Sequence, residues 1–213
     1  MQSAARVGCV IMAAGNAARF GENKLEALLD GRSLIRRAFD AVPEGLFHAV
    51  VVVTQYDRIE ALAETYGFSC VRNRHPELGL SHTVCLGTGA LGGCCDAILY
   101  MVADQPLLTA ATIRRLVAAW RENPEKIVSA ACGGRRGNPC VFPRAFFPEL
   151  QALCGDRGGS AVIRRHEDRL LALETGALEL SDCDTREALQ QLQEAGKYGK
   201  SSEKLKAPGP CQS

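Results

Sequence analysis

The segment from Ala13 to Lys24 combines small residues with two basic side chains, and this combination could bind a polyanion. It begins where a run of apolar residues ends. Small residues let the main chain approach a ligand closely, and successive N–H groups in a turn favour an anion. Arg19 would add charge as a planar fork and Lys24 as a point charge. The alternative is a flexible connection with two surface cations.

Asp104 is suited to hold a hard cation, because it follows the apolar run 97–103 at the expected end of a strand. Mg²⁺ keeps several of its waters and needs only one or two protein carboxylates while it bridges phosphates. Asp104 also has a purely local alternative, because aspartate commonly caps turns. Asp184 lies just ahead of the last expected helix and by itself is more typical of a helix cap.

Short apolar runs alternate with amphipathic segments, and these elements must position the candidate residues. Strands are expected at 7–13, 48–54, 68–71 and 97–103, and helices at 33–42, 58–66, 81–91 and 109–121. This alternation predicts a three-layer α/β/α, Rossmann-like domain with a mostly parallel, mixed sheet. Ligands bind beyond the carboxyl ends of strands in such folds. We therefore expect the segment after Ala13 and the side chain of Asp104 to share one edge of the sheet.

The last third of the chain is less regular. Strands are expected at 127–130, 139–142 and 170–173, and helices at 144–153, 160–166 and 185–195. A glycine and arginine loop is expected to reach Asn138. Pro139 has no amide hydrogen for a ladder bond, so its strand is predicted at a sheet edge. The composition then predicts one domain over residues 1–196 and a flexible tail at 197–213.

Composition and charge exclude several classes of protein. Of the 213 residues, 46% are hydrophobic and 23% are charged, which is typical of a soluble globular domain. Lys and Arg number 25 against 24 Asp and Glu, so no strong field is available for a nucleic acid or an anionic membrane. The apolar stretch 7–15 is shorter than the roughly 20 residues that span a bilayer. We expect neither a nucleic acid nor a membrane as a partner.

The ten cysteines are scattered and form no Cys-x-x-Cys pair, so structural zinc is not predicted. Several lie in apolar runs, where cysteine behaves as a small hydrophobic residue. Free thiols favour a reducing compartment, and we expect a cytoplasmic location. The four histidines likewise lack a zinc-binding spacing.

The pattern Ala-Ala-Gly-x-x-x-Arg-Phe-Gly-x-x-Lys resembles the signature loop of the MobA-like nucleotidyltransferases, the family related to molybdenum cofactor enzymes. That family usually has Met at the position of Phe20, and its loop wraps the triphosphate of a nucleoside triphosphate. The resemblance implies nucleotide-binding roles for Ala13, Ala14, Gly15, Arg19 and Lys24.

Three further motifs follow in the order of the family. Asp104-Gln105-Pro106 resembles the Asp-Gln-Pro whose aspartate holds magnesium, and 182–185 resembles the Asp-x-Asp-Thr that completes the metal site. The segment 79–83 resembles the stretch that lines the nucleotide pocket, with Thr83 in place of serine. The resemblance implies catalytic roles for Lys24, Arg19 and Asp104, a Mg²⁺ site at Asp104 and Asp184, and nucleotide contacts from Gly79, Ser81 and Thr83.

Two motifs resemble the molybdopterin branch of the family: Arg-Gly-x-Pro at 136–139 and Gly-Asp-x-Gly at 155–158. They imply acceptor-binding roles for Arg136, Pro139, Asp156 and Gly158. The family normally continues with Ala-Arg, where this chain has Gly159-Ser160. The candidates to replace the missing arginine are Arg157, Arg164 and Arg165.

The resemblance implies Mg²⁺-dependent transfer of CMP from CTP to molybdopterin or molybdenum cofactor, with release of pyrophosphate. CTP is favoured because the guanylyl branch has glycine where this chain has Ala14, whose methyl group leaves less room beside a purine. The alternatives are a guanylyltransferase, a sugar 1-phosphate nucleotidyltransferase, or an accessory protein without turnover. An accessory protein could bind nucleotide or cofactor and deliver the cofactor to a molybdenum hydroxylase apoenzyme.

Overall fold

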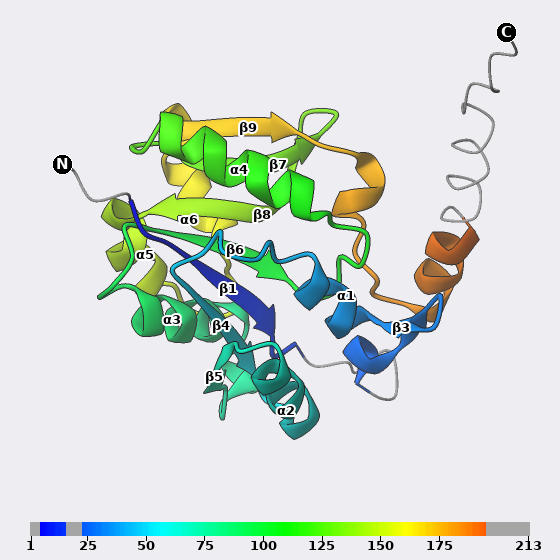
Figure 1. Cartoon of the computed structure of the whole chain (residues 1–213). Coiled ribbons are helices and arrows are strands. Elements are labelled where there is room, and N and C mark those ends of the chain that lie inside the picture. Colours follow the sequence, from blue (N-terminus) through cyan, green and yellow to red (C-terminus); the bar gives the residue numbers. More distant parts are fainter. Residues whose placement is uncertain (1–4, 16–22, 195–213) are drawn as a thin grey trace, which may run out of the picture.

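A mixed seven-stranded sheet forms the centre of the computed structural model, which describes residues 5–15 and 23–194 (Figure 1). Its strand order is β5-β4-β1-β6-β8-β7-β9. The parallel half consists of β1 (Val7–Ala13), β4 (Ala49–Thr54), β5 (Ser69–Arg72) and β6 (Ala97–Val102). The other half consists of β7 (Ile127–Cys132), β8 (Arg135–Pro143) and β9 (Leu170–Glu174), of which β8 runs antiparallel to both neighbours. The predicted α/β fold is confirmed.

Helices cover both faces of the sheet. One face packs against α1 (Leu34–Asp40), α2 (Asp57–Thr65) and α4 (Ala110–Glu122), and the other against α3 (Leu80–Leu91), α5 (Phe147–Gln151) and α6 (Ser160–Arg165). Successive residues of a strand point to opposite faces, so Ile11 joins the first core and Val10 the second. A side chain at Gly87 of α3 would come within 2.6 Å of Val10, so glycine allows the close approach of that helix.

Short 3₁₀ segments complete the description. They are η1 (Lys24–Glu26), η2 (Pro76–Leu78), η3 (Arg144–Phe146), η4 (Glu167–Arg169) and η5 (Ala177–Leu180). Residues 186–194 are helical, close to the expected 185–195. The predicted tail at 197–213 lies outside the described residues.

The prediction of an edge strand at Pro139 is wrong, because β8 lies in the sheet interior between β6 and β7. Its ladder with β6 ends at the pair Tyr100 and Cys140, one residue short of Pro139. On the other side the register shifts at a bulge, where residues 137–139 face only Ala130. Pro139 therefore sits where neither neighbour requires an amide donor. The strand also starts at Arg135, inside the stretch that was expected to be a loop.

A small hairpin of β2 (Leu28–Leu29) and β3 (Arg32–Ser33) was not predicted. Its turn is Asp30-Gly31, and both residues have positive φ, 50° and 77°. Asp-Gly between two strands is a common hairpin turn for that reason, so the signal was present in the sequence. The hairpin connects η1, which carries Lys24, to the first helix.

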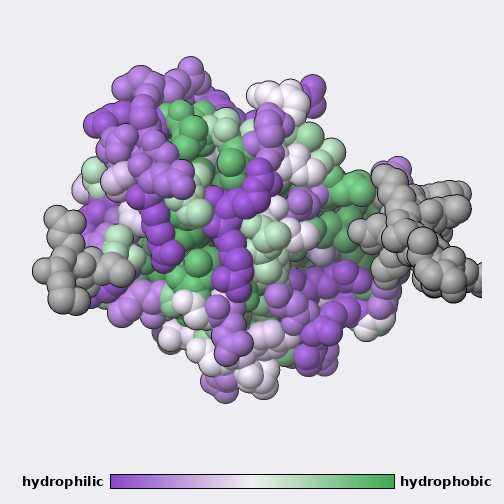
Figure 2. Space-filling model, turned by 45° about the horizontal axis from the view of Figure 1, so that its top comes forward, coloured by the Kyte–Doolittle hydropathy of each residue, from purple (hydrophilic) through white to green (hydrophobic). Residues whose placement is uncertain are grey.

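The surface view in Figure 2 shows a face on which hydrophilic residues predominate and hydrophobic ones form smaller patches between them. Among the described residues, no helix has the combination of length and apolarity that crossing a membrane would require.

Candidate active site

Lys24 lies between two aspartates at the carboxyl end of the sheet. Its Nζ is 2.6 Å from Oδ2 of Asp104 and 2.7 Å from Oδ1 of Asp184. The side chains of Lys24 and Asp104 are only 15% and 19% exposed, whereas that of Asp184 is 59% exposed. Of the four charged residues that the sequence proposed for one site, three therefore meet here, with Lys24 in direct contact with both aspartates.

Local structure explains how these residues meet. Asn23 caps η1 by accepting a hydrogen bond from the main-chain N–H of Leu25, whose side chain is buried and anchors the segment beside the sheet. Asp104 lies two residues after the end of β6. Its main-chain oxygen accepts a hydrogen bond of 2.8 Å from the N–H of Cys183, which brings the neighbouring Asp184 to the same place.

Burial and neighbouring charges shift the pKa values of two groups in and beside this cluster. Burial lowers the pKa of Lys24, but attraction and hydrogen bonds from Asp104 and Asp184 outweigh it, so the pKa is raised overall and the ammonium stays charged. Burial also raises the pKa of the nearby Asp182, and the charge of Asp104 adds to this effect. Oδ1 of Asp104 is buried and has no hydrogen-bond partner among the described residues. A carboxylate oxygen is thus left available to a cation.

The small residues at the end of β1 and just after it are held by residues at the end of β4 and just after it. The carbonyl oxygens of Ala13, Ala14 and Gly15 accept hydrogen bonds from Thr54 Oγ1, Gln55 Nε2 and the Tyr56 hydroxyl. These bonds are 2.9 to 3.1 Å long. The only signal for this role in the sequence is the position of these three residues at the end of a parallel strand. Arg19 lies outside the described residues.

The segment around Gly79 packs against the loop that starts at Gly155. Gly79 has φ +82° and ψ −170°, and an added Cβ would lie 2.8 Å from the carbonyl oxygen of Gly155. That oxygen accepts a hydrogen bond from the N–H of Ser81, and Asp156 accepts a longer one of 3.4 Å from Leu80. The motif expected for nucleotide binding and the motif expected for acceptor binding therefore touch.

We expect Gly79→Ala to destabilise the fold by about 1 to 3 kcal/mol, because only glycine occupies this backbone region without strain. Gly89→Ala is the matched control on the adjoining helix α3: nothing lies within 4 Å of its added Cβ, and alanine stabilises helix interiors by roughly 1 kcal/mol. Urea unfolding of both variants measures the difference. Equal stability of the two variants would contradict the prediction.

Ser81 and Thr83, the two hydroxyl candidates of this segment, are both buried. The Thr83 hydroxyl accepts a hydrogen bond of 3.2 Å from Asn73 Nδ2. The side-chain Oδ1 of Asn73 accepts one from the main-chain N–H of His75. Asn73 therefore links the end of β5 to α3, a connection that the sequence did not reveal.

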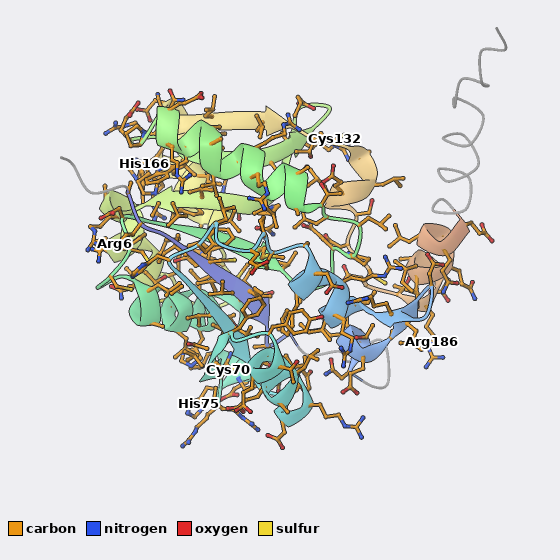
Figure 3. All side chains as sticks on the ribbon, viewed as in Figure 1. Arg6, Cys70, His75, Cys132, His166 and Arg186 are labelled. Carbon is orange, nitrogen blue, oxygen red and sulfur yellow. The ribbon has the colours of Figure 1, made fainter. Side chains whose placement is uncertain are left out.

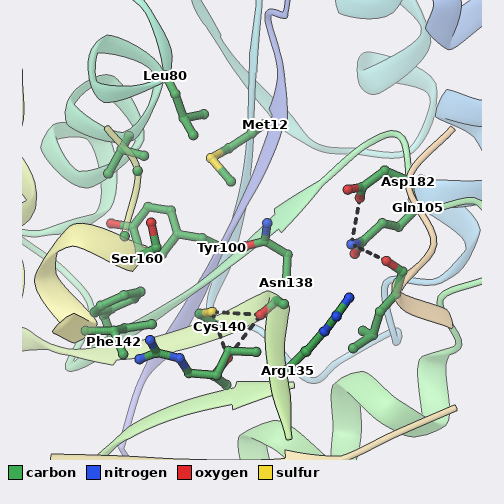
Figure 4. A pocket seen from close by; sticks show the side chains of 18 of the residues that line it. Met12, Leu80, Tyr100, Gln105, Arg135, Asn138, Cys140, Phe142, Ser160 and Asp182 are labelled. Carbon is green, nitrogen blue, oxygen red and sulfur yellow. Dashed lines mark hydrogen bonds between the residues drawn. The ribbon is translucent and has the colours of Figure 1, made fainter. Parts of the chain in front are cut away.

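A cavity of about 980 Å³ opens beside the charged cluster (Figure 4). Apolar side chains such as Met12, Leu80 and Phe142 line part of it. Gln105 and Asp182 also line it, and they lie one residue after Asp104 and two residues before Asp184. Of the four acceptor candidates, Arg136 and Gly158 line the cavity. Pro139 is buried within β8, and Asp156 contacts the start of α3.

The three candidate replacements for the missing arginine are exposed and are not among the residues that line the cavity: Arg157, Arg164 and Arg165. Arg165 forms an ion pair of 2.7 Å with Glu149. Arg136, which does line the cavity, approaches Glu167 at 3.6 Å. Ser160, which stands where the family has arginine, lines the cavity.

Cysteine and histidine side chains of the described residues are spread over the molecule. Figure 3 shows Cys70 and His75 near one end of the molecule and Cys132 and His166 well away from them. All nine cysteines in the described part of the chain are free thiols. That part also contains no cluster of three or more His, Cys, Asp or Glu residues arranged to hold a metal.

Comparison with solved structures identifies the class of this fold as that of nucleotidyltransferases. A nucleotidyl transferase from Methanothermobacter thermautotroptrophicus superposes with a TM-score of 0.76 at 22% identity, over 91% of this chain and 99% of the other. The molybdopterin-guanine dinucleotide biosynthesis protein A of Archaeoglobus fulgidus gives 0.70 at 15% identity, over 90% and 99%.

The model of the MobA-like NTP transferase domain matches residues 9–170, and the chain belongs to this family. The family resemblance read from the sequence is confirmed, and with it nucleotidyl transfer as the general activity. The purine catabolism protein PucB of Bacillus subtilis is 28% identical over 202 residues, 87% of this chain and 95% of PucB. A 3-deoxy-manno-octulosonate cytidylyltransferase from Francisella philomiragia is 24% identical, but the match covers 51% of this chain and only 44% of that enzyme.

Proposed function

We propose that the protein transfers CMP from CTP to molybdopterin or molybdenum cofactor. An oxygen of the acceptor's phosphate forms a bond to the α-phosphorus of CTP, and the bond to the departing pyrophosphate breaks. The observation that carries the proposal is the contact of Lys24 with Asp104 and Asp184 beside the large cavity. This places charged groups suited to a triphosphate next to space for a bulky acceptor.

The nucleophile of this reaction is already an anion, so no general base is required. Catalysis then consists of holding the two substrates in line and neutralising charge on the phosphoryl groups. Lys24 supplies a buried ammonium, and the main chain at Ala14 and Gly15 is fixed by its bonds to the end of β4. Arg19 is proposed to add a second cation.

Asp104 and Asp184 fit a divalent ion, which we propose to be Mg²⁺. The two carboxylates converge on one position, now filled by the Lys24 ammonium, and Oδ1 of Asp104 has no partner among the described residues. Two carboxylates are the usual protein contribution to a Mg²⁺ site that also binds phosphates. A structure of Rv0371c in complex with manganese, 21% identical to this chain, has the same fold and supports a divalent ion here. The ion would neutralise charge on the phosphates.

Two observations favour CTP. Ala14 stands where the guanylyl branch has glycine, and its added methyl group leaves less room beside a purine. The relatives also include cytidylyltransferases. The acceptor is supported by the cavity, whose apolar residues and Arg136 suit a large ring system that carries a phosphate. Delivery of the product to a molybdenum hydroxylase apoenzyme remains part of the proposal.

A phosphorylated sugar is the second candidate acceptor. Gly159-Ser160 stands in place of the Ala-Arg of the molybdopterin branch, which favours a different acceptor. The 3-deoxy-manno-octulosonate cytidylyltransferases among the relatives are named for a sugar acid, which supports a sugar as that acceptor but not its phosphate.

The test is pyrophosphate release from CTP or GTP with Mg²⁺ and either molybdenum cofactor or a panel of sugar 1-phosphates. We expect the fastest release from CTP with molybdenum cofactor. Faster turnover of GTP would overturn the base preference, and turnover only with a sugar phosphate would overturn the acceptor. No release with any pair would favour an accessory protein over an enzyme.

A further inference from the structure

The segment 180–184 has two roles in the structure. Leu180 and Asp182 line the large cavity, and Asp184 two residues later contacts Lys24 in the charged cluster. The end of η5 and the short irregular segment after it therefore form part of the cavity wall and carry a proposed metal ligand. Its position must be fixed accurately, because displacement by about 1 Å is enough to impair a catalytic site.

Gln105 holds this segment from across the site. Its side-chain Nε2 donates one hydrogen bond of 3.0 Å to Oδ1 of Asp182 and another of 3.3 Å to the carbonyl oxygen of Leu180 (Figure 4). The residue is only 3% exposed. Gln105 directly follows Asp104. Its two hydrogen bonds, which we call the Gln105 clamp, therefore connect the segment 180–184 to the strand end that supplies the other proposed metal ligand.

The orientation of the Gln105 amide is fixed by its partners. A rotation of the amide by half a turn would place its oxygen against a carboxylate and a carbonyl, both of which are acceptors. Two acceptors on one side therefore require the NH₂ group there. The cost is that Oε1 is buried without a hydrogen-bond partner among the described residues. A residue used only for packing would not need this arrangement.

We propose that Gln105 is a positioning residue for nucleotidyl transfer, which clamps the segment 180–184 so that Asp184 meets Asp104 and Asp182 faces the cavity. This proposal rests on the metal site proposed above. Groups that orient metal ligands commonly affect metal affinity and activity by about 10- to 100-fold when they are removed.

The first variant is Gln105→Met, which keeps the length and neutrality of the side chain but removes both donors. We expect its Mn²⁺ affinity, titrated into the millimolar range by electron paramagnetic resonance, to fall about tenfold or more, with a similar fall in kcat. Gln151→Met is the matched control, because Gln151 is an exposed residue at the end of α5 and is not among the residues that line the cavity. It should bind Mn²⁺ like the wild type.

A double variant that restores a hydrogen bond between positions 105 and 182 tests whether the loss of Mn²⁺ affinity comes from the lost bond or from a less stable fold. In the double variant Gln105→Glu with Asp182→Asn the net charge is unchanged, and the side-chain amide introduced at position 182 can donate to the carboxylate introduced at position 105. We expect it to recover part of the Mn²⁺ affinity lost in Gln105→Met. Thermal unfolding of each variant shows whether the fold is intact.

The outcomes distinguish the clamp from the metal site itself. One outcome is that the wild-type protein and Gln105→Met bind Mn²⁺ equally well, whereas Asp184→Ala does not bind it. This outcome would overturn the clamp and leave the proposed metal site standing. Wild-type protein whose Mn²⁺ binding is indifferent to Asp184→Ala would overturn the metal site.

Discussion

Asp104→Ala is expected to lower the rate of pyrophosphate release by about 10²- to 10³-fold, the usual loss when one electrostatic group is removed from such a site. The variant loses one of two carboxylates that converge on the same position, and with it the buried Oδ1 that has no partner among the described residues. Lys24 also loses its shorter ion pair. The measurement is turnover at saturating CTP over a range of Mg²⁺ concentrations.

Asp104→Asn keeps the shape of the side chain and removes only its charge, so we expect a loss of the same order. Asp168→Ala is the control, because Asp168 is an exposed aspartate of η4, just before β9. Its main-chain oxygen, which accepts a bond from Lys126, remains in the variant. Circular dichroism checks the fold. Full activity of Asp104→Ala would contradict the proposed chemistry.

Lys24→Met is expected to change two measurements in opposite directions. Turnover should fall by about 10²- to 10³-fold, because the triphosphate loses a cation. The affinity of the nucleotide-free protein for Mn²⁺ should instead rise, by about tenfold or more, because the ammonium no longer fills the position between Asp104 and Asp184. Two charges 4 Å apart interact by about 4 kcal/mol at an effective dielectric constant of 20, which is ample for this change.

Lys126→Met is the matched control for this experiment. It changes the net charge by the same amount, but Lys126 donates to a main-chain oxygen at the distant β9 side of the sheet. Its variant should keep wild-type turnover and Mn²⁺ affinity. If Lys24→Met and Lys126→Met bind Mn²⁺ equally well, the ammonium and the metal do not share one position.

The sequence predicted the residues of the charged cluster because each lies close to the end of a recognisable element. Asp104 follows the apolar run of β6, and Lys24 comes soon after that of β1. Parallel neighbouring strands end at the same edge of a sheet, so both side chains had to lie near each other. Asp184 was harder to place, and only the family motif pointed to it.

Several features of the site left no such signal. The clamp of Gln105 on Leu180 and Asp182 joins residues 75 and 77 positions apart, and the Gly79 contact with Gly155 crosses a similar distance. The support that Gln55 gives to Ala14 also depends on which strands are neighbours. Spacing along the chain carries no information on such pairs, because it records local periodicity only.

The amino-acid sequence by itself determined the alternation of strands and helices, the α/β class and the edge of the sheet where ligands bind, because these follow from local apolar periodicity. Only the tertiary structure decided that β8 lies inside the sheet and that Pro139 sits in its bulge. It also decided that a single ammonium joins Asp104 and Asp184. Those outcomes depend on strand order and on packing between distant segments, which no local pattern encodes.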